Sequence, residues 1–213
     1  MIEYLGGSIE VSESSKGKTI FLKHSKLSKI STYEVVGDFS SAAFIIVAAL
    51  ISKNSEVMIK NVGLNKTRSG LLEVLLKMNA NIEIVNKTKT CNEECGDIIV
   101  KSSELEGINV PNSIIPNIID EIPILSVAAS FAKGQTIIKN ASELKVKESD
   151  RLHATSMGLK TMNVKHDLLD DGLIINGIQD DVEIHKEIES FGDHRIAMSF
   201  LIAGLRSKNG VKV

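Results

Sequence analysis

The stretch DFSSAAFIIVAALISKNSEVMIKN, residues 38–61, decides the fold because the rest of the sequence repeats its pattern. An acidic residue opens the stretch, an apolar run of helix length follows, a short polar break ends the run, and a strand pattern closes it. The run from residue 44 to residue 51 is apolar on nearly all sides, which is typical of a helix buried in a core. This stretch therefore predicts a central helix followed by a strand.

The same unit recurs twice along the chain, as DEIPILSVAASFAKGQTIIKN at residues 120–140 and DHRIAMSFLIAGLRSKNGVKV at residues 193–213. A pattern that recurs in this way indicates a repeat architecture. An amphipathic helix that closes into a strand follows at residues 71–84, and a related pattern stands at residues 159–164. Three buried helices that alternate with strands predict a layered α/β fold, and a Rossmann unit is disfavoured because no Gly-x-Gly-x-x-Gly follows a strand.

Length, composition and charge restrict the classes of function. The 213 residues are 43% hydrophobic and 24% charged, enough to bury a real core in one large or two small domains. Lys+Arg 25 nearly balance Asp+Glu 27, so no overall field attracts nucleic acid or an anionic membrane. We expect a soluble cytoplasmic protein whose anion binding is local, with neither nucleic acid nor a membrane as partner.

The two cysteines, Cys91 and Cys95, lie in a polar stretch. No further Cys or Cys/His pair stands nearby to complete a zinc site. The sequence therefore predicts two free thiols on a loop and no metal centre.

The segment KESDR, residues 147–151, concentrates charge ahead of a predicted helix. One interpretation is a solvated helix start in which Glu148 and Arg151 pair three residues apart. The other starts from Lys147 and Arg151, like charges four residues apart, which is unfavourable unless an anion lies between them. Glu148 would then lie beside two cations, either held ionised or used to pass a proton.

A second charged cluster begins at Asp193, a plausible N-cap of the third apolar helix. His194 and Arg195 then fall in the first turn, where cations oppose the helix dipole although the exposed N–H groups favour an anion. A bound phosphate or carboxylate would resolve this conflict. The alternative is that Arg195 forms a salt bridge with a neighbouring domain and His194 caps a carbonyl.

A third cluster, Asp120 and Glu121, stands at the start of the second apolar helix, with Pro123 in its first turn. Capping explains one acid but not two, so Asp120 is either a cap or a general base whose proton affinity depends on nearby cations. Asp38 has the same place in the first unit without a neighbouring His, Arg or second acid. We predict that Asp38 is a cap.

Four segments together resemble the 5-enolpyruvylshikimate-3-phosphate synthase family in order and spacing: GDFSSAA at 37–43, DEIP at 120–123, KVKESDRL at 145–152 and GDHRIAM at 192–198. The resemblance covers essentially the whole chain. It implies two similar domains of the inside-out α/β barrel type, each built from three βαβαββ units around buried helices, with the active site between them. We then expect residues 1–36 to end the N-terminal domain and residues 37–213 to form most of the C-terminal one, incomplete at both ends.

The reaction that the resemblance implies moves the enolpyruvyl group of phosphoenolpyruvate onto the 5-hydroxyl of shikimate 3-phosphate and releases phosphate. It belongs to the shikimate pathway of aromatic amino-acid and chorismate biosynthesis and needs no metal or organic cofactor. By resemblance, Asp120 would take the proton of the hydroxyl and Glu148 would exchange protons with the methylene carbon. The implied substrate contacts are Lys147 to shikimate 3-phosphate, and Arg151, His194 and Arg195 to phosphoenolpyruvate, where glyphosate would compete.

The chain also departs from the family pattern. Glu143 stands where some members place an Asn that touches shikimate 3-phosphate, so we leave it out of the predicted site. Half of the family's anion-binding residues would come from an N-terminal domain that this chain lacks and from a C-terminal Lys. We therefore expect the isolated chain to bind weakly and to be inactive without that domain as its partner.

Two other functions compete with this one. UDP-N-acetylglucosamine enolpyruvyltransferase shares the repeat but, in our interpretation, not the KESDR segment. A non-catalytic α/β binding or assembly domain would use the charged clusters as salt bridges between domains.

Overall fold

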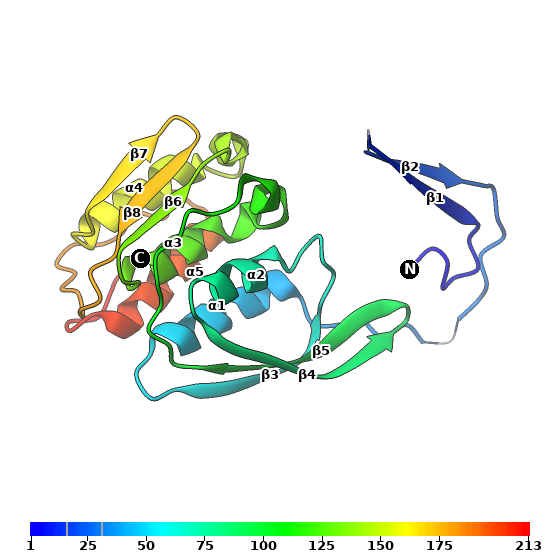
Figure 1. Ribbon diagram of the computed structural model, residues 1–213, viewed down its shortest axis with the longest axis horizontal. Coiled ribbons are helices and arrows are strands. Elements are labelled where there is room, and N and C mark those ends of the chain that lie inside the picture. The colour runs from blue at the N-terminus through cyan, green and yellow to red at the C-terminus, as the bar shows by residue number, and fades with distance from the viewer. Residues whose placement is uncertain (16, 31) are drawn as a thin grey trace.

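Three helices pack against one another at the centre of the computed structural model, which describes residues 1–15, 17–30 and 32–213. They are α1 (Phe39–Ile51), α3 (Ile122–Ser130) and α5 (His194–Ala203), and each corresponds to one of the predicted apolar runs (Figure 1). All nine residues of α3 are buried. The prediction of a helix buried on every side is therefore confirmed for α3.

The third helix, α5, does not fit that prediction. Ile196 and Phe200 are fully buried, but Leu201 is 52% exposed and Met198 is 37% exposed. One face of α5 packs towards α3, and the other lies in solvent. An apolar run shows only that a helix is able to be buried on all sides, and neighbouring elements decide how many of its faces are covered.

The first unit continues from α1 into a small antiparallel sheet covered by a second helix. Its elements are β3 (Glu56–Gly63), α2 (Gly70–Lys77), β4 (Asn81–Thr90) and β5 (Glu93–Lys101), with the strands in the order β3-β5-β4. An isolated parallel bridge between Gly37 and Val62 joins the chain that enters α1 to this sheet. The predicted amphipathic helix and its strand are confirmed.

The second unit repeats this topology. Three short 3-10 turns belong to it: η1 (Asn112–Asn117), η2 (Ile119–Glu121) and η3 (Ser142–Val146). The helix α4 (Arg151–Thr161) and the strands β6 (Gln135–Ile138), β7 (His166–Leu169) and β8 (Gly172–Asn176) follow α3, in the sheet order β6-β8-β7. A parallel bridge between Asn109 and Ile137 matches the bridge of the first unit.

The third copy of the pattern folds only in part as predicted. After α5 and the 3-10 turn η4 (Gly204–Arg206), a parallel bridge pairs Val182 with Ser207. The predicted strand at residues 211–213 does not form a ladder, although the Ile188 amide donates to the Lys212 carbonyl at 2.9 Å. A strand pattern becomes a strand only where a second strand pairs along it.

The prediction that both cysteines are free thiols is confirmed, but the predicted loop position is right only for Cys91. Both thiols are free, and Cys91 lies in the turn between β4 and β5. Cys95, however, belongs to β5 and is 1% exposed, with its Sγ atom 3.4 Å from Oγ1 of Thr90. The polar residues around it misled the prediction, because alternate side chains of a strand point to opposite faces.

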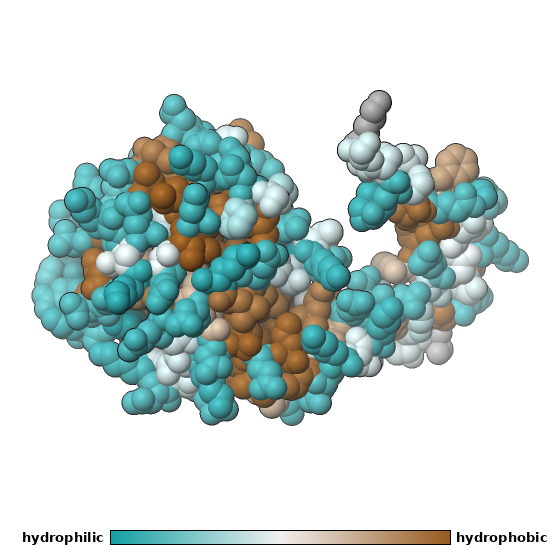
Figure 2. Space-filling view, viewed as in Figure 1, coloured by the Kyte–Doolittle hydropathy of each residue, from teal (hydrophilic) through white to brown (hydrophobic). Residues whose placement is uncertain are grey.

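A β-hairpin, β1 (Ile9–Ser14) and β2 (Gly17–Leu22), stands away from the three helices (Figure 1). Ile20 is 64% exposed and Phe21 is 59% exposed, and hydrophobic side chains gather on this hairpin in the space-filling view (Figure 2). Among the described residues, the helices lack the combination of length and apolar composition that crossing a lipid bilayer requires.

Candidate functional site

Charged side chains from all three units meet where the central helices begin. Asp120 lies in η2, directly ahead of α3, and its side chain is 22% exposed. Its Oδ1 atom is 3.1 Å from Nη1 of Arg151 and 3.8 Å from Nζ of Lys147. Its Oδ2 atom is 3.7 Å from Nη1 of Arg68 and 3.7 Å from Nη2 of Arg195. Four cations therefore surround this carboxylate, two at each oxygen.

Asp120 is not a helix cap, so the capping interpretation of this acid is wrong. Asp120 lies within the 3-10 turn η2 that precedes α3, and the N-cap position of α3 is Glu121, which makes no side-chain capping bond. Pro123, near the start of α3, has no N–H group to offer. Neither Asp120 nor Glu121 thus caps the start of α3, and both side chains are available for contacts with other side chains.

Asp38, in contrast, caps α1 as predicted. Its Oδ2 atom accepts hydrogen bonds from the backbone amide of Ser41 at 2.7 Å and from the Ser41 hydroxyl at 2.8 Å. Burial acts to raise the pKa of Asp38, but these bonds and a further one from the Ser40 amide outweigh it and lower the pKa below its ordinary value. The acid of the first unit, Asp38, therefore serves to cap its own helix.

Glu121 is a buried acid beside Asp120, with 3% of its surface exposed. The Ser40 hydroxyl donates to its Oε1 atom at 2.6 Å, and Nη1 of Arg195 lies 3.5 Å from the same oxygen. Burial raises the pKa of Glu121, and the Ser40 hydrogen bond and the charges of Arg195 and Arg68 oppose that rise only in part. Glu121 therefore takes up a proton at a higher pH than an ordinary glutamate does.

Arg151 joins three carboxylates although its side chain is only 1% exposed. Its Nε atom donates to Asp193 at 2.7 Å, and Nη2 donates to Glu148 at 2.5 Å, in addition to the Asp120 contact. A charge is buried this deeply only where acids pair with it. The predicted pair of Glu148 and Arg151 is confirmed.

The helix itself starts later than the charge pattern suggested. Arg151 is the first residue of α4, and Asp150 is its N-cap, accepting from the His153 amide at 3.0 Å. Lys147 lies ahead of the helix, so it and Arg151 are not neighbours on one helical turn. Lys147 instead contacts Oε1 of Glu143 at 2.6 Å, which neutralises part of its charge.

The predicted N-cap of α5 is confirmed. Asp193 is 1% exposed and accepts hydrogen bonds from the Arg195 amide at 2.9 Å and the Ser149 hydroxyl at 3.1 Å. Burial acts to raise the pKa of Asp193, but the hydrogen bonds from Arg151 and the Arg195 amide prevail and lower it. His194, the first residue of α5, is exposed.

Arg195 resolves the expected conflict with the helix dipole by folding towards acids of its own chain. Its guanidinium reaches the Asp120 backbone carbonyl at 3.3 Å and the Asp120 and Glu121 side chains. The alternative that Arg195 forms a salt bridge with a neighbouring domain is not needed to explain its place in the fold.

Sequence reasoning missed Arg68 and Ser40. Arg68 lies in the loop between β3 and α2, is 50% exposed at its side chain, and donates from Nη2 to the Ser40 hydroxyl at 2.9 Å. One signal was available, because Arg68 shortly precedes the second helix of the first unit just as Arg151 opens the second helix of the second unit. A comparison of the repeated units would have found it.

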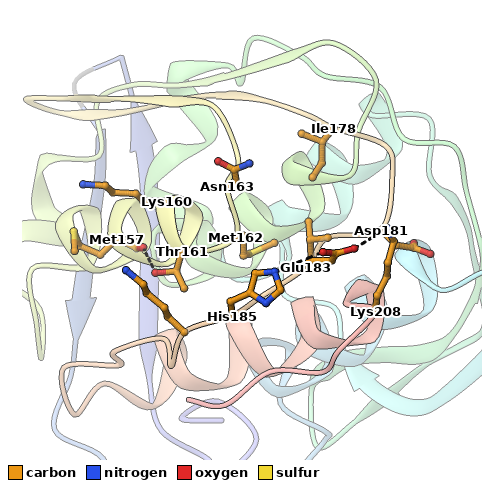
Figure 3. Close-up of a pocket in the computed structure, with 12 residues that line it drawn as sticks. Met157, Lys160, Thr161, Met162, Asn163, Ile178, Asp181, Glu183, His185 and Lys208 are labelled. Atoms are coloured by element: carbon orange, nitrogen blue, oxygen red, sulfur yellow. Dashed lines mark hydrogen bonds and ion pairs between the residues drawn. The ribbon is translucent and has the colours of Figure 1, made fainter.

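A cavity of about 820 Å³ lies elsewhere. It runs between the end of α4 and the segment around Glu183 (Figure 3), where Glu183 pairs with Lys208 at 3.1 Å and with His185 at 3.5 Å. None of the residues around Asp120 lines it. Within the described ranges, no group of three His, Cys, Asp or Glu residues is placed to hold a metal ion.

The cluster is thus suited to bind anions and to exchange protons. Charged groups that meet from separate segments of the chain are typical of functional sites. The cations come from three repeated units, whereas a structural ion pair needs only two side chains. The alternative of a solvated helix start does not explain why Arg151 is buried among carboxylates.

The family model described as "EPSP synthase (3-phosphoshikimate 1-carboxyvinyltransferase)" matches residues 1–213. A 3-phosphoshikimate 1-carboxyvinyltransferase of Petrotoga mobilis is 45% identical over 214 residues, which cover 100% of this chain and 48% of the relative. The EPSP synthase structure from Acinetobacter baumannii has a TM-score of 0.90 at 38% identity and covers 99% of this chain and 48% of that one.

A more distant structure, the enolpyruvyl transferase NikO from Streptomyces tendae, has a TM-score of 0.70 at 15% identity, covers 99% of this chain and 46% of that one, and shows a shared fold alone. These likenesses confirm the predicted α/β fold. The chain spans about half the length of the curated relatives it matches.

Proposed function

The chain belongs to the EPSP synthase (3-phosphoshikimate 1-carboxyvinyltransferase) family, and from this premise we propose that it supplies half of an enolpyruvyl-transfer site. The reaction would join the 5-hydroxyl oxygen of shikimate 3-phosphate to the enolpyruvyl carbon of phosphoenolpyruvate and release inorganic phosphate, within aromatic amino-acid biosynthesis. The observation that carries this proposal is the Asp120 carboxylate within 4 Å of four cations. Both substrates are multiply charged anions, and arginine and lysine are the side chains that bind phosphate and carboxylate groups.

Asp120 is the proposed base that takes the proton of the attacking hydroxyl. Its carboxylate is not used as a cap, and its 22% exposed side chain is within reach of a bound molecule. Lys147, which is 24% exposed beside it, would hold shikimate 3-phosphate. A base must come within hydrogen-bond distance of the proton that it removes, and Lys147 next to Asp120 would bring the hydroxyl there.

Glu148 is the proposed group that exchanges a proton with the methylene carbon of phosphoenolpyruvate. Its side chain is 56% exposed and is held by Nη2 of Arg151, so it is able to move between that arginine and a substrate atom. Arg151, His194 and Arg195 would hold phosphoenolpyruvate. For Arg151 this requires the substrate carboxylate to take the place of Glu148 at Nη2, which would release Glu148 for its own role.

We also propose that residues 1–36 belong to an N-terminal domain and residues 37–213 to a C-terminal one. The hairpin of β1 and β2, which stands apart from the three central helices, supports this division (Figure 1). The remaining half of the relatives' length would supply the second wall of the site. No cofactor is invoked in this proposal.

A chimera tests the function. This chain would replace the aligned 214 residues of the Petrotoga mobilis relative, and phosphate release would be measured with phosphoenolpyruvate and shikimate 3-phosphate. We expect turnover in the chimera, inhibition by glyphosate, and neither in the chain alone. Turnover with UDP-N-acetylglucosamine instead would indicate the other enolpyruvyltransferase. A folded chimera that gives no phosphate and no calorimetric heat would favour a non-catalytic domain.

A further inference from the structure

Arg68 reaches the cluster from the first unit, whereas Lys147 and Arg151 come from the second and Arg195 comes from the third. Arg68 makes two contacts in this cluster. Nη1 lies 3.7 Å from Oδ2 of Asp120, and Nη2 donates to the Ser40 hydroxyl at 2.9 Å. Its side chain is half exposed, so burial alone does not require these contacts.

Ser40 passes the effect of Arg68 on to Glu121. The hydroxyl has a single hydrogen, which it donates to Oε1 of Glu121 at 2.6 Å while its lone pair accepts from Arg68. An N–H group that donates to a hydroxyl orients that hydroxyl and strengthens the hydrogen bond that it makes in turn. Ser40 is 4% exposed, so water does not readily replace either partner.

We propose that Arg68 is a positioning residue that ties the first unit to both acids ahead of α3, contacting Asp120 directly and Glu121 through Ser40. The inference rests on the proposed function, because it matters for catalysis only if Asp120 is the base. Arg151 and Lys147 hold Oδ1 of Asp120 from within the second unit, and Arg68 and Arg195 hold Oδ2 from the other two units. The carboxylate is thereby oriented from both sides.

The direct test is the carboxyl titration of Glu121, followed by NMR in the 213-residue chain with labelled glutamate. Arg68→Met removes a half-exposed cation and should raise the proton affinity of Glu121 about twofold to fivefold, the range expected for an exposed ion pair. Arg68→Lys should recover part of this change, because lysine keeps the charge but does not hold two acceptors in a planar fork.

Two comparisons make the test specific. Lys66→Met removes an exposed cation from the same loop and should leave Glu121 unchanged. In a Ser40→Ala background, Arg68→Met should have a smaller effect, since the hydroxyl that links the two residues is gone. Equal shifts from Lys66→Met and Arg68→Met, or an effect of Arg68→Met that Ser40→Ala does not reduce, would overturn the proposal.

Calorimetry with shikimate 3-phosphate extends the test to substrate. Arg68→Met should weaken binding to the chimera several-fold, and Lys66→Met should leave it unchanged; equal affinities for the wild type and Arg68→Met would contradict a positioning role. If the unmutated chimera binds neither substrate, the proposed function fails, whereas the titration of Glu121 still decides whether Arg68 acts through Ser40.

Discussion

The first and second units share one topology but use the acid ahead of their central helix in opposite ways. Asp38 turns its carboxylate onto the amide of its own helix, and its charge is satisfied by local structure. Asp120 lies within the 3-10 turn η2, two residues before α3, and its carboxylate faces cations from three units instead. The difference shows that the first turn of the helix decides whether an acid is structural or available for chemistry.

The arginine near the start of the second helix also differs in exposure between the two units. Arg68 in the first unit is 50% exposed, and Arg151 in the second is 1% exposed among three carboxylates. Arg68 therefore makes its contacts at the surface, whereas Arg151 is part of the buried core. Each of the following predictions tests how far this contrast between the units extends.

The largest expected effect is that of Arg151→Met. Removing the guanidinium leaves Asp193 buried without its cation, and breaking a buried ion pair in this way costs about 3–5 kcal/mol. Arg68→Met, the matched change in the first unit, should cost at most about 1 kcal/mol. Urea unfolding of both variants measures the difference, and equal losses of unfolding free energy would remove the contrast between the two arginines.

A smaller loss is expected where α4 of the second unit packs on α5. In Gly158→Ala the new methyl group would stand 2.0 Å from Cζ of the buried Phe200, and such overpacking costs about 1–3 kcal/mol. Gly70→Ala, at the start of α2 in the first unit, approaches its nearest neighbour at 2.9 Å and should cost less. Thermal unfolding of the two variants checks the order, and a larger loss for Gly70→Ala would contradict it.

Replacing the acids themselves separates capping from chemistry. Asp38→Ala removes a cap and should lower the free energy of unfolding by about 1 kcal/mol. Asp120→Ala removes no cap but takes one acid partner from the buried Arg151, so it should also lower the free energy of unfolding, and it should abolish phosphate release by the chimera. Urea unfolding and the phosphate assay are measured on both variants. Full activity of Asp120→Ala would refute its role as base, and loss of phosphate release by a folded Asp38→Ala chimera would show that Asp38 is not only a cap.

Much of the fold was predictable from the sequence because the repeats carry strong apolar periodicity. The helices α1 and α3 and the cap at Asp193 follow from local patterns of a few residues. The contacts of Arg68 did not follow, since the loop that carries it meets Asp120 only after both units have folded. The exposed face of α5 and the unpaired segment at residues 211–213 were missed for a related reason, because a pattern does not say which neighbours are present.

The pH dependence of stability should also differ in sign between the two units. The pKa of Glu121 is raised in the folded state, so its contribution is fully present below the ordinary glutamate value and is lost as the pH rises through the raised one. The pKa of Asp38 is lowered, so its contribution is present above the ordinary aspartate value and is lost as the pH falls through the lowered one.

Glu121→Gln should therefore remove the decline in stability at rising pH, and Asp38→Asn should remove part of the decline in stability at falling pH. Urea midpoints from acidic to neutral pH measure both slopes, and a Glu121→Gln variant that loses stability with rising pH as steeply as the unmutated chain would show that Glu121 is not protonated in that window.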